Sequence, residues 1–104
     1  MPDDRAEGTF QVINPLGVHA RVASMLVLCA NRYRADVTLT REGEEDGEPH
    51  VNGKSIMGVL MLAAPKGTRI RVVAEGPDAG DAIKAIGELF AAGFNEMGGR
   101  RSGA

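Results

Sequence analysis

The chain has 104 residues, which is enough for one domain with a single core but hardly for two. Its 43% apolar and 25% charged residues are typical of a soluble globular protein and not of a disordered chain or a fibre. The formal net charge of -2 argues against a broad face that binds nucleic acid. Because no apolar run approaches the roughly 20 residues that cross a bilayer, we expect no membrane insertion.

The sequence contains a single cysteine, Cys29, so neither an internal disulfide nor a thiolate metal cage can form. Residues 1–5 do not combine a positive segment with an apolar stretch, as a secretory signal would. We therefore expect a cytoplasmic protein that holds no metal and no cofactor, and whose function comes from local groups of side chains.

The first half of the sequence predicts the order strand, helix, strand, strand. Residues 9–13 form a short β-compatible run, and residues 20–33 carry apolar side chains at helical spacing. Residues 36–41 alternate between polar and apolar side chains, as in a half-buried strand. The acidic stretch 41–49 is typical of an exposed hairpin tip, and a very short strand at residues 50–51 follows it.

The second half predicts a helix, a strand and a last helix. Ser55 can cap a short helix that runs to about residue 62. Residues 68–74 alternate most clearly, with the apolar side chains on one face of a strand. A turn at residues 76–78 opens the last helix, whose apolar stripe ends near residues 98–99.

Four strands that each have one apolar face suit an antiparallel sheet with helices on one side only. The predicted fold class is therefore α+β, an open-faced β-sandwich of the order β-α-β-β-α-β-α. In it, three helices cover one face of a four-stranded antiparallel sheet. We expect one domain at residues 9–97, a flexible N-terminal extension at 1–8 and a flexible tail at 98–104.

A histidine stands at the start of the first predicted helix, after a loop that contains proline and glycine. The first turn of a helix has unpaired N–H groups and a partial positive charge, which stabilise a phosphoryl group. A phosphoryl group on His19 could accept hydrogen bonds from the N–H groups of Ala20, Arg21 or Val22. The guanidinium of Arg21 can hold two further oxygens. The pattern favours a phosphorylated histidine, and a structural histidine beside a solvated arginine is the alternative.

Ser55 is a second candidate for phosphate chemistry, at the start of the short helix. As an N-cap it stabilises that helix by about 1 kcal/mol. A phosphate there would be tolerated by the helix N-terminus and would place about two negative charges beside the apolar residues that follow. Such a modification would block a partner surface.

Both of these helices present apolar side chains that cannot all face inward. Methionine suits surfaces that accept several partners, and ordinary scattered surface residues are the alternative. The predicted partner patch consists of Ser24, Met25, Leu28, Ile56, Met57 and Leu60.

The two segments together resemble HPr, the histidine-containing phosphocarrier family of the bacterial phosphoenolpyruvate-dependent phosphotransferase system. Gly17-Val18-His19-Ala20-Arg21 is similar to the phosphorylation-site motif of the family. Val51-Asn52-Gly53-Lys54-Ser55-Ile56-Met57-Gly58-Val59 is similar to its regulatory-serine segment. The resemblance runs from Thr9 to about Phe94 and reproduces the family's element order.

The resemblance implies that His19 receives a phosphoryl group on Nδ1 from phospho-enzyme I, with assistance from Arg21. It implies that the partner patch contacts enzyme I and A-type enzyme II components of sugar transport, and that HPr kinase/phosphorylase modifies Ser55. A carrier must release its phosphoryl group readily, and one helix end with one arginine holds it only modestly. We therefore expect a monomeric carrier and not an enzyme.

The sequence departs from the family pattern in two places. Val22 stands where the family usually has proline, which restores an N–H donor and loosens the first helical turn. The acidic stretch 44–48 is several residues longer than usual, which costs little in an exposed loop.

Two alternatives remain open. The first is a regulatory binding protein controlled at Ser55 in an incomplete phosphotransferase system, with His19 little used. The second is a small acyl-phosphate hydrolase, for which Asn14 could orient water and Arg21 could bind phosphate. Partner binding that survives removal of His19 would favour the first, and steady release of phosphate from acetyl phosphate would favour the second.

Overall fold

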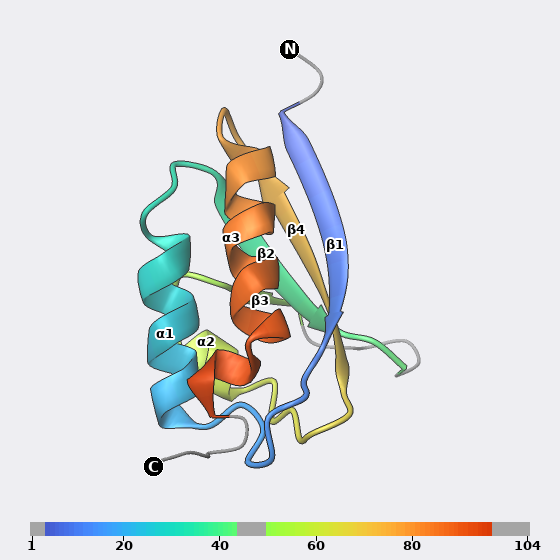
Figure 1. Cartoon of the computed structure of the whole chain (residues 1–104). Coiled ribbons are helices and arrows are strands. Elements are labelled where there is room, and N and C mark those ends of the chain that lie inside the picture. Colours follow the sequence, from blue (N-terminus) through green and yellow to red (C-terminus); the bar gives the residue numbers. More distant parts are fainter. Residues whose placement is uncertain (1–3, 44–49, 97–104) are drawn as a thin grey trace.

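The computed structural model describes residues 4–43 and 50–96. In it, helices cover one face of a four-stranded antiparallel sheet (Figure 1), so the predicted α+β open-faced sandwich and its element order are confirmed. No helix within these two ranges is long and apolar enough to span a membrane. The elements are β1 (Arg5–Gln11), α1 (Ala20–Ala30), β2 (Asp36–Arg41), β3 (His50–Asn52), α2 (Ile56–Leu60), β4 (Arg69–Glu75), α3 (Ala79–Ala91) and a 3-10 turn, η1 (Gly93–Asn95).

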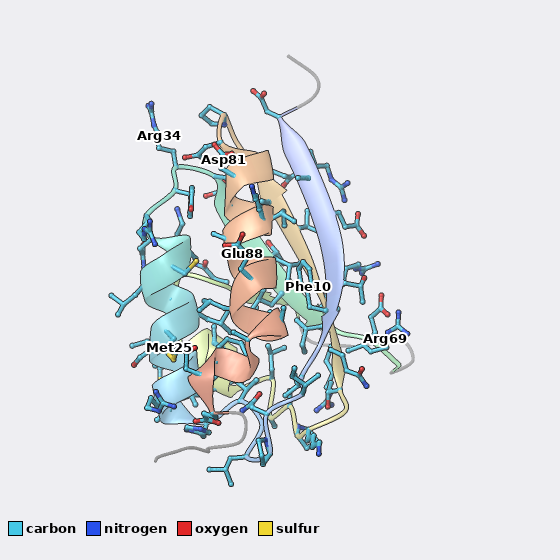
Figure 2. All side chains as sticks on the ribbon, viewed as in Figure 1. Phe10, Met25, Arg34, Arg69, Asp81 and Glu88 are labelled. Atoms are coloured by element: carbon cyan, nitrogen blue, oxygen red, sulfur yellow. The ribbon has the colours of Figure 1, made fainter. Side chains whose placement is uncertain are left out.

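The strand order of the sheet is β1-β4-β2-β3, so β4 lies between β1 and β2. Phe10 of β1 pairs with Ile70 of β4, and Val72 of β4 pairs with Leu39 of β2. In each strand the alternate side chains face the helices, as the period of two requires. Arg69, the neighbour of Ile70, lies on the opposite face, away from the helices (Figure 2).

A row of three phenylalanines connects the sheet to the last turn of the chain. Phe10 of β1 stacks on Phe90 of α3 with 5.4 Å between ring centroids. Phe90 in turn meets the edge of Phe94 in η1 at 5.0 Å. Phe94 is fully buried. Aromatic pairs of this kind contribute about 0.5–1.5 kcal/mol beyond their buried area, so they fix η1 against α3.

β1 begins earlier than the sequence predicts. Arg5 to Gly8 pair with Val72 to Glu75 of β4, so the prediction of a flexible extension through residue 8 is wrong for these four residues. The strand is hard to recognise because its inward positions are small, Ala6 and Gly8, while its outward positions are charged. Residues 1–3, 44–49 and 97–104, which include the predicted tail and most of the acidic hairpin, lie outside the described residues.

Both long helices end before their predicted limits. α1 stops at Ala30, three residues before the predicted end at Tyr33. α3 stops at Ala91, because Gly93 takes a left-handed φ of 59° that ends the helix. The alternation of residues 36–41 predicts that Thr40, a polar position, faces outward. Thr40 is instead buried beside His50, and its Oγ1 lies 2.8 Å from Nδ1 of that ring.

Asp78 ties the start of α3 to the connection between α1 and β2. Its carboxylate accepts the backbone N–H of Arg34 at 2.9 Å and that of Ala35 at 2.9 Å. The hydrogen bond from Arg34 is the largest influence on the pKa of Asp78 and lowers it. Burial raises the pKa, but the bond from Ala35 lowers it again, so the net shift is downward.

We predict that Asp78→Ala lowers Tm by several degrees at pH 7. Because the folded pKa lies below the unfolded value of about 3.9, this stability is present above that pH and is lost as the pH falls through the folded pKa. Thermal unfolding of the native protein and of Asp78→Ala, at pH 7 and in strong acid, measures the difference in Tm. Asp81→Ala, in the first turn of α3, is the control. A Tm difference that persists in strong acid would contradict this account.

Candidate functional site

Close contacts fix the loop before α1, and this loop positions the side chain of His19. Gly17 has a φ of +71°, and a Cβ there would lie 2.6 Å from the carbonyl oxygen of Ala64 and 2.9 Å from Cα of Pro65. The next residue, Val18, donates its N–H to the same Ala64 oxygen at 2.9 Å. Glycine is therefore required at position 17, and the loop delivers His19 to the N-cap of α1.

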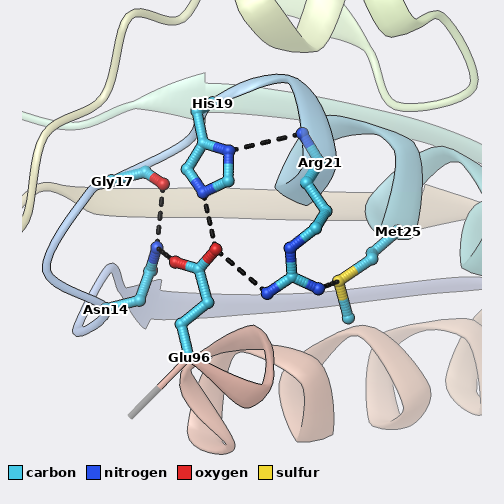
Figure 3. A network of polar contacts seen from close by, with 6 residues as sticks. All are labelled: Asn14, Gly17, His19, Arg21, Met25 and Glu96. Carbon is cyan, nitrogen blue, oxygen red and sulfur yellow. Dashed lines mark hydrogen bonds and ion pairs between the residues drawn. The ribbon is translucent and has the colours of Figure 1, made fainter. Parts of the chain in front are cut away.

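The two ring nitrogens of His19 have different partners (Figure 3). Nδ1 accepts the backbone N–H of Arg21 at 3.3 Å, and Nε2 lies 2.6 Å from Oε2 of Glu96. A backbone N–H can only donate, so Nδ1 presents a lone pair, whereas a carboxylate accepts, so Nε2 carries the proton. The side chain is 33% exposed. Solvent and partners can therefore reach a ring whose Nδ1 is unprotonated and lies at the positive end of a helix.

Glu96 is the residue of this site that sequence reasoning missed. Its side chain is only 11% exposed. Oε2 also accepts NH2 of Arg21 at 3.1 Å, and Oε1 accepts Nδ2 of Asn14 at 2.9 Å. Burial raises the pKa of Glu96, but the hydrogen bonds from Asn14, His19 and Arg21 outweigh it and lower the pKa overall. The carboxylate is therefore ionised at neutral pH.

A left-handed turn brings Glu96 to this position. Gly93, Phe94 and Asn95 have φ values of 59°, 55° and 63°. For residues other than glycine this region costs roughly 1–2 kcal/mol each. The burial of Phe94 offsets part of that cost and orients the turn. No local sequence pattern signals the contact, because 77 positions separate His19 from Glu96.

Arg21 places its guanidinium beside the histidine. One arm bonds to Glu96, and NH1 contacts Sδ of Met25, a weak acceptor, at 3.8 Å. The side chain is 56% exposed, so NH1, which has only this weak contact with Met25, can reach an incoming anion. Ala20 and Val22, on either side of Arg21, are the other residues predicted to supply N–H groups. Ala20 is exposed, while Val22 packs its side chain into the core.

A family model described as the PTS HPr component phosphorylation site matches residues 6–92. The chain belongs to the HPr family. It is 44% identical over 90 residues to phosphocarrier protein HPr of Xylella fastidiosa strain Temecula1, covering 86% of this chain and 96% of that protein. The fold and the predicted family are thus confirmed, and the chain is an HPr phosphocarrier of the phosphotransferase system.

Solved HPr structures agree with the fold. The structure of HPr-C-His from Thermoanaerobacter tengcongensis has 35% identity and a TM-score of 0.77, covering 88% of this chain and 97% of that one. A structure titled as an HPr dimer from the same organism has 36% identity and a TM-score of 0.63, covering 75% of this chain and 84% of that one.

Ser55 forms the N-cap of α2, as its position in the HPr-like segment predicts. Its Oγ accepts the N–H of Gly58 at 3.0 Å. The neighbouring Lys54 donates from Nζ to the carbonyl oxygen of Tyr33 at 2.8 Å, which links this turn to the end of α1. A modification at Ser55 would thus occur on a helix start that is held in place.

The predicted partner patch is only partly exposed. Leu28, Ile56 and Met57 are exposed, whereas Met25 and Leu60 pack partly against the core and Ser24 is half-buried. The structure adds two exposed apolar side chains that the sequence analysis did not name, Leu16 before α1 and Met61 after α2.

The side-chain amide of Asn14 bonds both to the loop before α1 and to Glu96. The side chain is fully buried, and Nδ2 donates to the carbonyl oxygen of Gly17 at 2.8 Å as well as to Glu96. Asn14 therefore fixes the loop that carries His19 and, at the same time, the carboxylate that contacts it.

We predict that Asn14→Ala lowers the free energy of unfolding by about 1–3 kcal/mol, because two buried acceptors lose their donor. Denaturant unfolding measures the change. Asn31→Ala is the matched control, since its amide donates to the carbonyl oxygen of Val27 at 3.0 Å from an exposed position. An equal loss in both variants would contradict the role of Asn14.

Proposed function

We propose that His19 accepts a phosphoryl group on Nδ1 from phospho-enzyme I and passes it to A-type enzyme II components. The observation that carries the proposal is the state of Nδ1, which accepts an N–H and therefore has a lone pair available at the start of α1. This nitrogen needs no base to remove a proton before it reacts.

The transfer can be written from the contacts of the ring. Nδ1 releases the hydrogen bond from the N–H of Arg21, and its lone pair attacks phosphorus. An N–P bond forms and the bond from phosphorus to the donor atom breaks, with its electron pair leaving on the donor. Nε2 keeps its proton throughout. The phosphoryl oxygens then meet the N–H groups of Ala20, Arg21 and Val22, and the guanidinium of Arg21 adds charge-assisted hydrogen bonds.

The same site suits a carrier better than an enzyme. A ring that is 33% exposed leaves the phosphoryl group open to a second protein, which can take it in a reversal of the first step. Asn14, the water-orienting residue of the hydrolase alternative, is buried and bonded to Gly17 and Glu96. In this proposal the protein acts as a monomeric, stoichiometric carrier in the cytoplasm and serves sugar transport.

Exposed apolar side chains supply the surface for both protein partners. Leu28 on α1 and Ile56 and Met57 on α2 lie on the two helices that pack against each other beside His19. Leu16 before α1 and Met61 after α2 are exposed as well, and we include them in the proposed surface. Enzyme I and the enzyme II components would use it in turn, which explains why adaptable methionines suit it.

We predict that incubation with phosphoenolpyruvate and enzyme I adds one acid-labile phosphoryl group to the protein. Intact mass measured before and after brief acid treatment reports it. His19→Ala abolishes the gain, because the acceptor nitrogen is lost. His50→Ala is the matched control, since His50 is the second histidine and bonds to Thr40 in the sheet, and it retains the label.

If an active enzyme I leaves the native protein unlabelled, the transfer proposal fails. Ser55 control of a binding protein then becomes the better account, and a His19→Ala variant that still binds its partner would support it.

Ser55 is proposed as a regulatory phosphorylation site for HPr kinase/phosphorylase. The hydroxyl caps α2 directly before the exposed Ile56 and Met57. A phosphate there keeps a favourable position at the helix N-terminus. It also brings negative charge to the proposed docking surface, so it would weaken docking without unfolding the helix.

We predict that Ser55→Asp keeps the stability of the native protein but slows phosphorylation of His19 about tenfold, equivalent to about 1.4 kcal/mol. Aspartate caps a helix as well as serine does. Ser55→Ala should do the opposite. It lowers the free energy of unfolding by about 1 kcal/mol and keeps the native rate of His19 phosphorylation. Denaturant unfolding and the initial labelling rate separate the two effects, and an unchanged rate in Ser55→Asp would refute the blocking role.

A further inference from the structure

We propose that Glu96 is a positioning residue for phosphoryl transfer, whose charged carboxylate holds the proton on Nε2 and balances the positive charge of the ring once Nδ1 is phosphorylated. The inference rests on His19 being the phosphoryl acceptor. Glu96 acts through the ring and not on phosphorus, because it contacts Nε2, the nitrogen that does not react.

The geometry fixes the carboxylate on both of its oxygens. Oε2 takes Nε2 of His19 at 2.6 Å and NH2 of Arg21 at 3.1 Å, while Oε1 takes Nδ2 of Asn14 at 2.9 Å. At 11% exposure the side chain is shielded from water. A charged, well-held acceptor of this kind fixes the tautomer and the orientation of a histidine.

The charge of Glu96 acquires a second purpose when the N–P bond forms. Before the transfer the ring is neutral, with one proton on Nε2. Afterwards both nitrogens are substituted, one by hydrogen and one by phosphorus, so the ring carries a positive charge. The carboxylate beside Nε2–H stabilises that charge as it develops, which lowers the barrier to transfer.

The turn that carries Glu96 supports a specific role. Phe94 and Asn95 both adopt left-handed backbone angles directly before Glu96, with φ of 55° and 63°. Strained residues persist where the surrounding structure enforces them, and they cluster at functional sites. Here the buried ring of Phe94 against Phe90 enforces the turn, and the carboxylate is what the turn delivers.

Glu96→Gln tests the charge, because glutamine keeps the size and an oxygen acceptor. The initial rate of phosphoryl transfer is measured over a range of phospho-enzyme I concentrations. We expect the maximal rate to fall about tenfold or more with KM unchanged, by analogy with the losses that follow when the carboxylate partner of a metal-binding histidine is removed. KM stays constant because Glu96 is shielded from the docking partner.

Glu88→Gln is the matched control, since it removes the same charge from an exposed position on α3 (Figure 2) and keeps the native rate. The ¹⁵N chemical shifts of the His19 ring give a second readout, in which the Nε2 signal of Glu96→Gln shifts as its charged acceptor is lost. An altered fold alone would not produce this selective change.

A Glu96→Gln rate within twofold of the native protein, or a loss confined to KM, would overturn the inference. Different results would refute the acceptor role of His19 and the positioning role of Glu96. An unlabelled native protein refutes the acceptor role of His19, whereas a labelled native protein with an unaffected Glu96→Gln variant refutes only the role of Glu96.

Discussion

The geometry of the site depends on one carboxylate, that of Glu96. It accepts hydrogen bonds from Asn14 before α1, from His19 at the helix start and from Arg21 in its first turn. Because three donors share two oxygens, the position of the ring, the location of its proton and the direction of the guanidinium are set together. Such networks are worth more than their separate contacts, so the site responds as a unit to a change in any member.

The order of the strands explains how the end of the described chain reaches the beginning of α1. β4 lies between β1 and β2, and α3, which follows it, packs across β1 and β4 (Figure 1). α3 therefore runs back toward the loop that precedes α1. The phenylalanine row from Phe10 to Phe94 fixes the last turn at that end, so packing in the core determines where Glu96 lies.

Local sequence patterns predicted the parts of the site that are built locally. His19, Arg21 and Ser55 belong to helix starts, where a loop and a capping residue determine the structure within a few positions. Glu96 could not be predicted this way, because its role depends on a contact across the fold and on the left-handed conformation of Phe94, which residue preferences disfavour. Arg5 to Gly8 were missed for a related reason, since an edge strand of small and charged residues shows its character only when it is paired.

In the proposed transfer, the charged and polar groups around His19 act on both nitrogens of the ring. Arg21 and the N–H groups of the first turn would attract the phosphoryl group, while one arm of the same guanidinium bonds to Glu96 beside Nε2. Val22, where HPr proteins usually have proline, adds a backbone N–H to the attractive side, and its side chain is accommodated in the core. With a phosphoryl group on Nδ1, as proposed, the N–H of Val22 would be an added donor to the phosphoryl oxygens, whereas Glu96 would act at Nε2, where its charge balances that of the ring. In the proposed transfer the two residues therefore support opposite nitrogens of one ring, although Val22 directly follows the family motif and Glu96 lies far from it in the sequence.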